Sequence, residues 1–158
     1  MSPSLVMLLA FLIGVIAGLR TMTAPAVVAW AANRHWLNLH NSPLSLMGST
    51  AAVAVFTVLA LGELVVDKLP STPSRTKLLG LIGRSVLGAL SGAAVAASGA
   101  QSIAPGAVLG VAGAIVGAFG GYEIRQRLVR ALKVPDFVIA LIEDTVAIAG
   151  GLLIVSRF

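Results

Sequence analysis

The chain has 158 residues, of which 58% are hydrophobic and only 11% are charged, with a mean hydropathy of +0.99. A soluble domain carries about one quarter charged residues, so this composition excludes an ordinary soluble protein and indicates an integral membrane protein. The formal net charge is +5, but the basic residues lie beside apolar runs, which favours anionic lipid headgroups over nucleic acid as their partner. Cysteine is absent, which excludes disulfides and thiolate chemistry.

The first apolar run, Pro3 to Leu19, has about the minimum length needed to cross a hydrocarbon core. No Lys or Arg precedes it, so we expect an uncleaved membrane span rather than a signal peptide. Gly14 and Gly18 lie four residues apart and therefore on one helical face, where small residues let a neighbouring helix approach closely.

A short second helix is expected over residues 24–35, after the span ends at Arg20. Thr21 or Thr23 is placed to cap its amino end, and Pro25 suits a first turn. The helix would cover only about 18 Å, which is too short to cross a bilayer. We therefore predict a re-entrant or interfacial helix.

The second span is predicted from Leu44 to Asp67. Glu63 and Asp67 lie near its end on one helical face, and Lys68 and Arg75 follow in a turn that contains two prolines. Two interpretations stay open. The charges form either an interfacial ion-pair cluster that fixes helix depth, or a gate or binding site for an ion or headgroup, since carboxylates inside a membrane are costly.

The third span is predicted over 78–98 and the fourth over 106–122, and both are rich in small residues. Gly88 and Gly92 in the third span are spaced for close helix contact. Glycines at 110, 113, 117 and 121 form a ridge along the fourth span, so that helix should be central and tightly packed. A polar, strongly basic connection is expected over 122–133.

The fifth span is predicted to start after Pro135 and to end near Val155. Glu143 and Asp144 lie in its interior, and Glu143 should sit close to mid-bilayer, about 12 Å along the helix. A charge at that depth costs about 2.5 to 3.5 kcal/mol on insertion scales. Glu143 should therefore be protonated, paired or in contact with water.

The distribution of basic residues predicts the orientation. Five spans place Arg20, Arg34 and Arg157 on one side of the membrane and the other eight basic residues on the amino-terminal side: Lys68, Arg75, Lys77, Arg84, Arg125, Arg127, Arg130 and Lys133. By the positive-inside rule, the amino terminus should be cytoplasmic and the carboxy terminus outside.

An internal repeat is also indicated within what we expect to be a single transmembrane domain. Residues 58–69 align with residues 138–149, and Glu63 matches Glu143. The half-repeats would be residues 3–70 and 106–156, joined by a linker helix over 78–98 that inverts the second copy. Inverted repeats are typical of transporters, with sites near the midplane.

Three motifs carry a resemblance to a known family: Ala17 to Thr21 with a downstream Pro25, Glu63 to Thr76, and Glu143-Asp144. Together they are similar to the bacterial membrane family called domain of unknown function 4126, over essentially the whole chain. The resemblance implies a small multipass protein of the bacterial inner membrane. It implies no established activity.

These observations predict an all-α membrane protein with about five transmembrane helices and the short helix over 24–35. We expect a small transporter, channel or flippase-like subunit for an ion or a small polar or lipid substrate, and the alternative is a structural or assembly protein. We expect a homo-oligomer, and we expect no enzymatic activity, no cofactor and no nucleic-acid partner. The sequence does not decide whether a metal binds. The candidate substrate or ion-binding residues are Glu63, Asp67, Glu143, Asp144, Arg20, Lys68 and Arg75.

Overall fold

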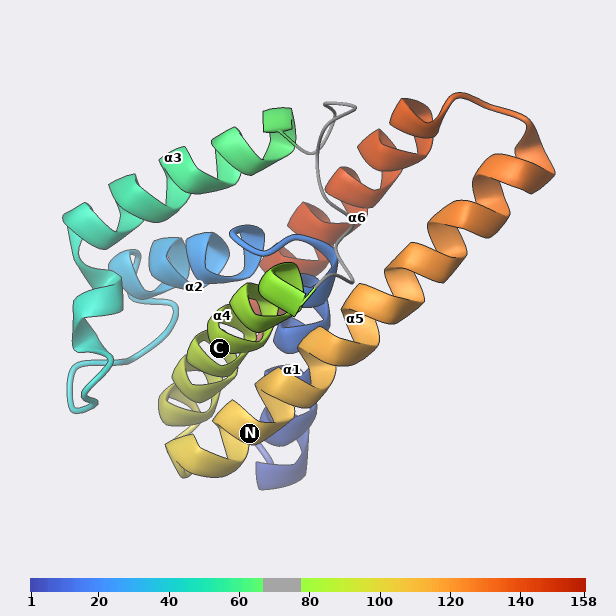
Figure 1. The fold of residues 1–158 in the computed structure, drawn as a ribbon. Coiled ribbons are helices and arrows are strands. Elements are labelled where there is room, and N and C mark those ends of the chain that lie inside the picture. The colour runs from blue at the N-terminus through green and yellow to red at the C-terminus, as the bar shows by residue number, and fades with distance from the viewer. Residues whose placement is uncertain (67–77) are drawn as a thin grey trace.

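A computed structural model describes residues 1–66 and 78–158, and this part of the chain is all helical (Figure 1). Its elements are α1 (Pro3–Leu19), α2 (Thr23–Asn33), the 3-10 helix η1 (Ser45–Gly48), α3 (Thr50–Val66), α4 (Leu78–Ser98), α5 (Ile103–Leu132) and α6 (Asp136–Val155). The helices α4, α5 and α6 are long and apolar enough to span a membrane, whereas α1 and α3 are apolar but have 17 residues each. The predicted all-α class is confirmed, and five full spans stay a prediction.

The core is formed by α1, α4 and α5, which approach one another through glycines. A Cβ atom on Gly14 would overlap the backbone of α5 at Gly110, and one on Gly92 would overlap α5 at Gly106. On α5, Gly113 faces the backbone of α1 in the same way. The predicted central position of the glycine-rich fourth span is therefore confirmed, because these backbones lie too close for any larger side chain.

The directions of these helices follow from the same contacts. Gly14 lies against Gly110, and Gly18, further along α1, lies against Gly117, so α1 and α5 run in the same direction (Figure 1). Equivalent helices of an inverted repeat must run in opposite directions, and α1 and α5 contain the first spans of the two predicted half-repeats. The predicted inversion of the half-repeats 3–70 and 106–156 is therefore wrong for this pair of helices.

The short helix α2 carries the chain from one end of the bundle towards the other. It begins beside Glu63, near the end of α3, and the segment after it reaches the end of α4, where the Asn38 N–H donates to Ser98 Oγ at 3.1 Å. Nine of its 11 residues are buried, and it packs against α3, α4 and α6. The helix was predicted, but this course differs from the predicted interfacial or re-entrant helix, which would stay on one side.

Because α2 carries the chain towards the other end of the bundle, the segments that share an end differ from those predicted. Val6, near the start of α1, lies against Gly99 at what we call the terminal end, together with the loop after α2 and the last residues of the chain. Arg84, near the start of α4, instead lies at the far end of α1, where it donates to the Gly18 carbonyl oxygen. The amino terminus and the basic segments were predicted to share a side. For Arg84 and for the segment 122–133 that prediction is wrong, and Arg20 lies at the same level as Arg84.

Two other boundaries differ from the expected ones. The basic segment 122–133 continues α5 as a helix to Leu132, because it contains no Gly or Pro, and it ends where Lys133 adopts a left-handed conformation (φ 52°) before Pro135. We call the end of the bundle that carries this segment the basic end. The second apolar run starts as η1, and Ser49 is extended, so α3 begins only at Thr50.

A substitution pair on α5 tests the close glycine packing. We expect Gly110→Ala to lower the free energy of unfolding by about 1 to 3 kcal/mol, because its methyl group would overlap the Gly88 carbonyl group. Gly120→Ala is the matched control, since a Cβ there meets nothing within 4 Å. Unfolding titrations in mixed micelles measure both values, and equal losses for the two variants would contradict the packing.

Candidate functional site: a polar junction

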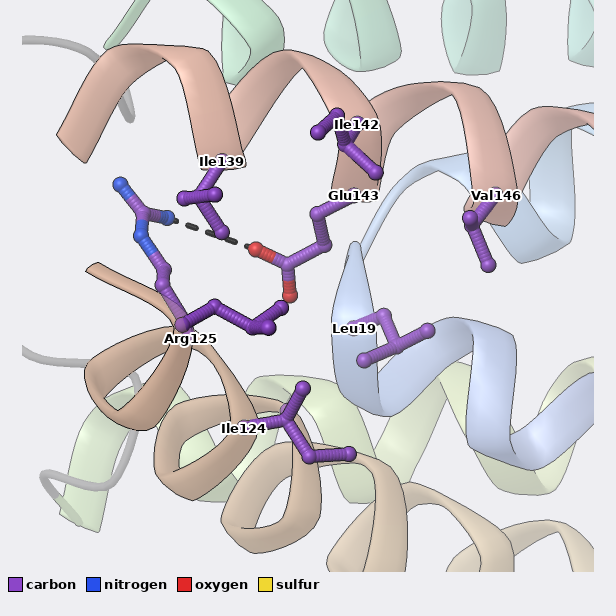
Figure 2. A pocket seen from close by; sticks show the side chains of 9 residues that line it. Leu19, Ile124, Arg125, Ile139, Ile142, Glu143 and Val146 are labelled. Atoms are coloured by element: carbon purple, nitrogen blue, oxygen red, sulfur yellow. Dashed lines mark hydrogen bonds and ion pairs between the residues drawn. The ribbon is translucent and has the colours of Figure 1, made fainter. Parts of the chain in front are cut away.

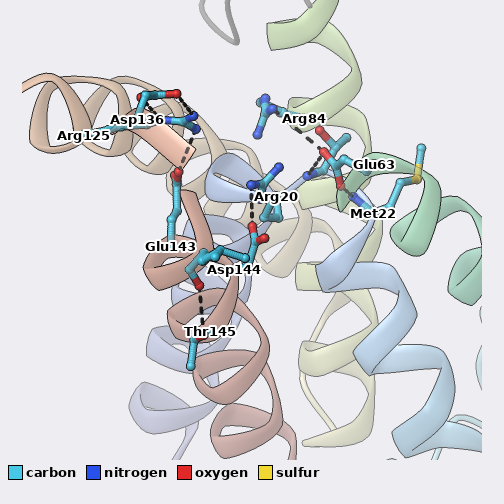
Figure 3. Close-up of polar contacts among 11 residues, drawn as sticks. Arg20, Met22, Glu63, Arg84, Arg125, Asp136, Glu143, Asp144 and Thr145 are labelled. Atoms are coloured by element: carbon cyan, nitrogen blue, oxygen red, sulfur yellow. Dashed lines mark hydrogen bonds and ion pairs between the residues drawn. The ribbon is translucent and has the colours of Figure 1, made fainter. Parts of the chain in front are cut away.

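Charged side chains from five segments meet where α1 ends and α2 begins (Figure 3). We call this cluster the polar junction, and its members are Arg20, Glu63, Arg84, Arg125, Glu143 and Asp144. The charged residues that are buried in the described part of the chain, Arg20, Arg84 and Asp144, all belong to the junction, and its other members are partly buried. The junction is therefore the candidate functional site.

Glu63 closes the amino end of α2. The Thr21 N–H donates to Oε1 of Glu63 at 2.7 Å, and the Met22 N–H donates to Oε2 at 2.8 Å. Amides at this end of a helix have no intrahelical acceptor, and the helix dipole there attracts a carboxylate. The expected cap by Thr21 or Thr23 is wrong, since the N-cap residue is Met22 and a residue of another helix supplies the acceptor.

Arg84 closes the carboxyl end of α1. Its Nη1 donates to the Gly18 carbonyl oxygen at 2.6 Å, and its Nη2 lies 3.9 Å from Oε1 of Glu63. A carbonyl group at the end of a helix lacks an amide donor from the next turn, so a buried guanidinium is a fitting partner. One arginine of α4 thus connects the end of α1 with the end of α3.

Arg20 is the most deeply buried charge in the described part of the chain, with a side chain that is 0% exposed. Its Nη2 pairs with Oδ1 of Asp144 on α6, and its backbone N–H donates to the Ile16 carbonyl oxygen at 2.8 Å. Charges that are removed from water must be paired, because the desolvation penalty of a lone ion is several kcal/mol. The pair fastens α6 to the end of α1.

Arg125 on α5 holds two carboxylates of α6. Its Nε and Nη2 donate to the two carboxylate oxygens of Asp136 at 2.9 Å and 2.5 Å, and its Nη1 lies 3.4 Å from Oε2 of Glu143. The contact with Asp136 is bidentate and short, whereas the distance to Glu143 is longer. Arg125 can therefore keep Asp136 while Glu143 moves away.

A pocket of about 200 Å³ lies beside this last pair, between α5, α6 and the end of α1 (Figure 2). Its lining is apolar apart from Arg125 and Glu143, and consists otherwise of Leu19, Gly121, Ile124, Leu128, Ile139, Ile142 and Val146. Figure 2 shows the Glu143 carboxylate and the Arg125 guanidinium facing each other among these side chains. The pocket suits an apolar or amphiphilic group rather than a hydrated ion.

The structure brings together four of the predicted site residues, Glu63, Glu143, Asp144 and Arg20. Asp67, Lys68 and Arg75 lie outside the described residues. Sequence reasoning missed Arg84 and Arg125 as site residues, although a lone arginine inside an apolar helix such as α4 was a signal for Arg84. Residues 1–66 and 78–158 contain no group of three or more His, Cys, Asp or Glu side chains that could hold a metal ion.

Three apolar helices of spanning length and a charged junction buried between them define the class of protein: a multipass membrane protein with embedded ion pairs. A family model described as a domain of unknown function (DUF4126) matches residues 7–156, nearly the whole chain. The chain therefore belongs to this family. No curated protein and no solved structure matches the chain in the corresponding comparisons.

Proposed function

We propose that the protein is a small, non-enzymatic transporter of the flippase type in the bacterial inner membrane, and that it moves an amphiphilic, lipid-like substrate. The observation that carries this proposal is the apolar pocket that ends on the Arg125–Glu143 pair. An apolar substrate segment would occupy the pocket, and its polar part would meet the ion pair. Glu143 is then the protonatable group that engages and releases Arg125.

The geometry of Arg125 supports this role for Glu143. The guanidinium has a bidentate anchor in Asp136, so it stays in place when its longer contact with Glu143 breaks. Protonation of Glu143, or the arrival of a polar headgroup, would remove the charge attraction across the pocket. Opening the pocket therefore requires only that Glu143 of α6 leaves Arg125, and no helix has to unfold.

The break between α1 and α2 supports a transport function as well. Transporters often contain interrupted helices whose exposed ends face the interior of the protein. Here the two ends are satisfied by Glu63 and Arg84, which belong to other helices. A movement of α3 or α4 would therefore shift the end of α1, where Leu19 lines the pocket. A homo-oligomer stays part of the proposal, because a chain of this size could enclose a wider path by self-association.

A structural or assembly role is the second candidate, and one observation favours it. Glu63 accepts two backbone hydrogen bonds, and Asp144 pairs with the fully buried Arg20, so these two carboxylates are engaged in holding helices together. The two candidates differ in what they require of Glu143. Transport needs its charge to change, whereas a structural role needs only that the pair with Arg125 persists.

A lipid-scrambling assay separates the two candidates. The full chain is reconstituted in phosphatidylcholine vesicles with a trace of NBD-labelled phosphatidylethanolamine, and dithionite bleaches the label on the outer leaflet. We expect bleaching beyond one half for the natural protein and a rate at least about ten-fold lower for Glu143→Gln, because the neutral Gln side chain cannot return to the charged state that re-engages Arg125 in each cycle. A ten-fold lower rate corresponds to about 1.4 kcal/mol in the barrier.

Glu123→Gln is the matched control, since Glu123 pairs with Arg127 on the exposed surface of α5 and does not line the pocket. Its scrambling rate should equal that of the natural protein. Bleaching that stops at one half for the natural protein would overturn the transport proposal and leave the structural role.

We also propose that the basic end faces the cytoplasm and that the terminal end, with both chain termini, faces outward. Of the described basic residues outside the polar junction, the basic end carries three and the terminal end carries two: Arg127, Arg130 and Lys133 against Arg34 and Arg157. The positive-inside rule counts basic residues near the ends of the spans, so it favours this orientation. It is opposite to the orientation predicted from the number of spans.

Single-cysteine labelling tests the orientation, and the cysteine-free chain is a ready background. Asn41→Cys lies in the exposed loop after α2, and Lys133→Cys lies at the end of α5. In spheroplasts, a membrane-impermeant maleimide should label Asn41→Cys, and it should label Lys133→Cys only after the membrane is permeabilised. The reverse labelling pattern would restore the cytoplasmic amino terminus.

A further inference from the structure

The last three turns of α5, residues 122–132, form an amphipathic extension whose basic face the proposed transport step does not use. The whole helix has 30 residues and is therefore about 45 Å long, whereas a hydrocarbon core is about 30 Å thick. An untilted α5 that starts at the terminal end must therefore emerge at the basic end. The emerging part reaches the level of the lipid headgroups.

The two faces of this extension differ in chemistry. Ile124, Leu128 and Leu132 follow one another at intervals of four residues, which places them in one row, and their side chains are exposed at 59%, 36% and 57%. Arg130 follows Leu128 by two residues, which is about 200° around the helix, and so lies on the opposite side. Arg127 precedes Leu128 by one residue, about 100° around the helix, and lies on the flank nearer to Arg130. The extension therefore has an apolar row and a separate basic face.

The basic face keeps a surplus of positive charge after its own contacts are counted. Arg127 Nε donates to Oε1 of Glu123 at 2.7 Å, whereas Arg130 Nη2 donates to the neutral Gln126 side chain at 3.2 Å. Lys133 follows at the carboxyl end of the helix. Within the described part of the chain, no carboxylate pairs with Arg130 or Lys133. Three cations thus share one carboxylate, and all of them are exposed.

We propose that Arg127, Arg130 and Lys133 form a binding surface for the phosphate groups of anionic phospholipids in the leaflet at the basic end. The apolar row of the same turns, of which Ile124 and Leu128 also border the pocket, is exposed and would lie towards the acyl chains, as in an amphipathic helix at a membrane surface. Arginine suits this partner because its planar guanidinium donates two parallel hydrogen bonds to phosphate. The chemistry commits the surface to a lipid rather than to free phosphate, because only a lipid satisfies both faces.

This inference does not depend on the transport proposal, because it requires only that α5 emerges from the membrane. A lipid-binding measurement therefore tests it separately from any flux assay. The full chain in detergent micelles is mixed with equal amounts of phosphatidylglycerol and phosphatidylcholine that have the same acyl chains. Native mass spectrometry then gives the ratio of the two lipids that remain bound.

We expect the natural protein to retain phosphatidylglycerol in preference, and Arg127→Gln/Arg130→Gln to lower the ratio by roughly five-fold for each arginine. Arg34→Gln/Arg157→Gln is the matched control, since it removes the same charge at the terminal end and should leave the ratio unchanged. Inorganic phosphate at millimolar concentration should not displace the lipid. Equal retention of the two lipids, equal losses in both double variants, or displacement by phosphate would each overturn the proposal.

Discussion

The structure depends on one constraint: the chain breaks between α1 and α2 inside an apolar bundle, and the groups released by that break must find partners. Backbone amides and carbonyl groups without partners cost several kcal/mol each where water is excluded. Glu63 accepts the amides at the start of α2, and Arg84 donates to the carbonyl group at the end of α1. The charges of these two side chains are therefore a consequence of the break.

The junction divides into a closed part and an adjustable part. Arg20 and Asp144 are buried together and fasten α6 to α1, while Glu63 and Arg84 fasten α3 and α4 to the same point. Glu143 differs because its contact with Arg125, at 3.4 Å, is longer and borders a pocket. The sequence already singles out Glu143 as the most costly carboxylate, and its contact beside the pocket is the reason for the role that we propose for it.

Much of the fold could be predicted from the sequence, because apolar length and glycine spacing are local signals. They predicted α4 and α6 with their observed bounds and the close packing of α1, α4 and α5. The end of the bundle at which each connecting segment lies could not be predicted. It depends on α2, whose 11 residues lead the chain back towards the terminal end. Counting only the helices long enough to span a membrane leaves out the change of end that α2 makes.

The partners of the charges could not be predicted either, because they come from distant parts of the chain. Glu63 lies 42 residues from Thr21, and no local pattern indicates that it caps α2 in place of a threonine. Arg125 was interpreted as part of a polar basic connection, since its pairing with Glu143 appears only when α5 continues as a helix beside α6. Tertiary contacts therefore decide the site, although the sequence indicates its acidic members.

Hydrogen–deuterium exchange at the Thr21 and Met22 amides tests the closure of the break most directly. Both amides should exchange slowly in the natural protein, and Glu63→Ala should accelerate them by about ten-fold or more, the factor that corresponds to about 1.4 kcal/mol, while Glu123→Ala leaves them unchanged. Rapid exchange of these amides in the natural protein, or exchange that does not respond to the loss of Glu63, would contradict the account.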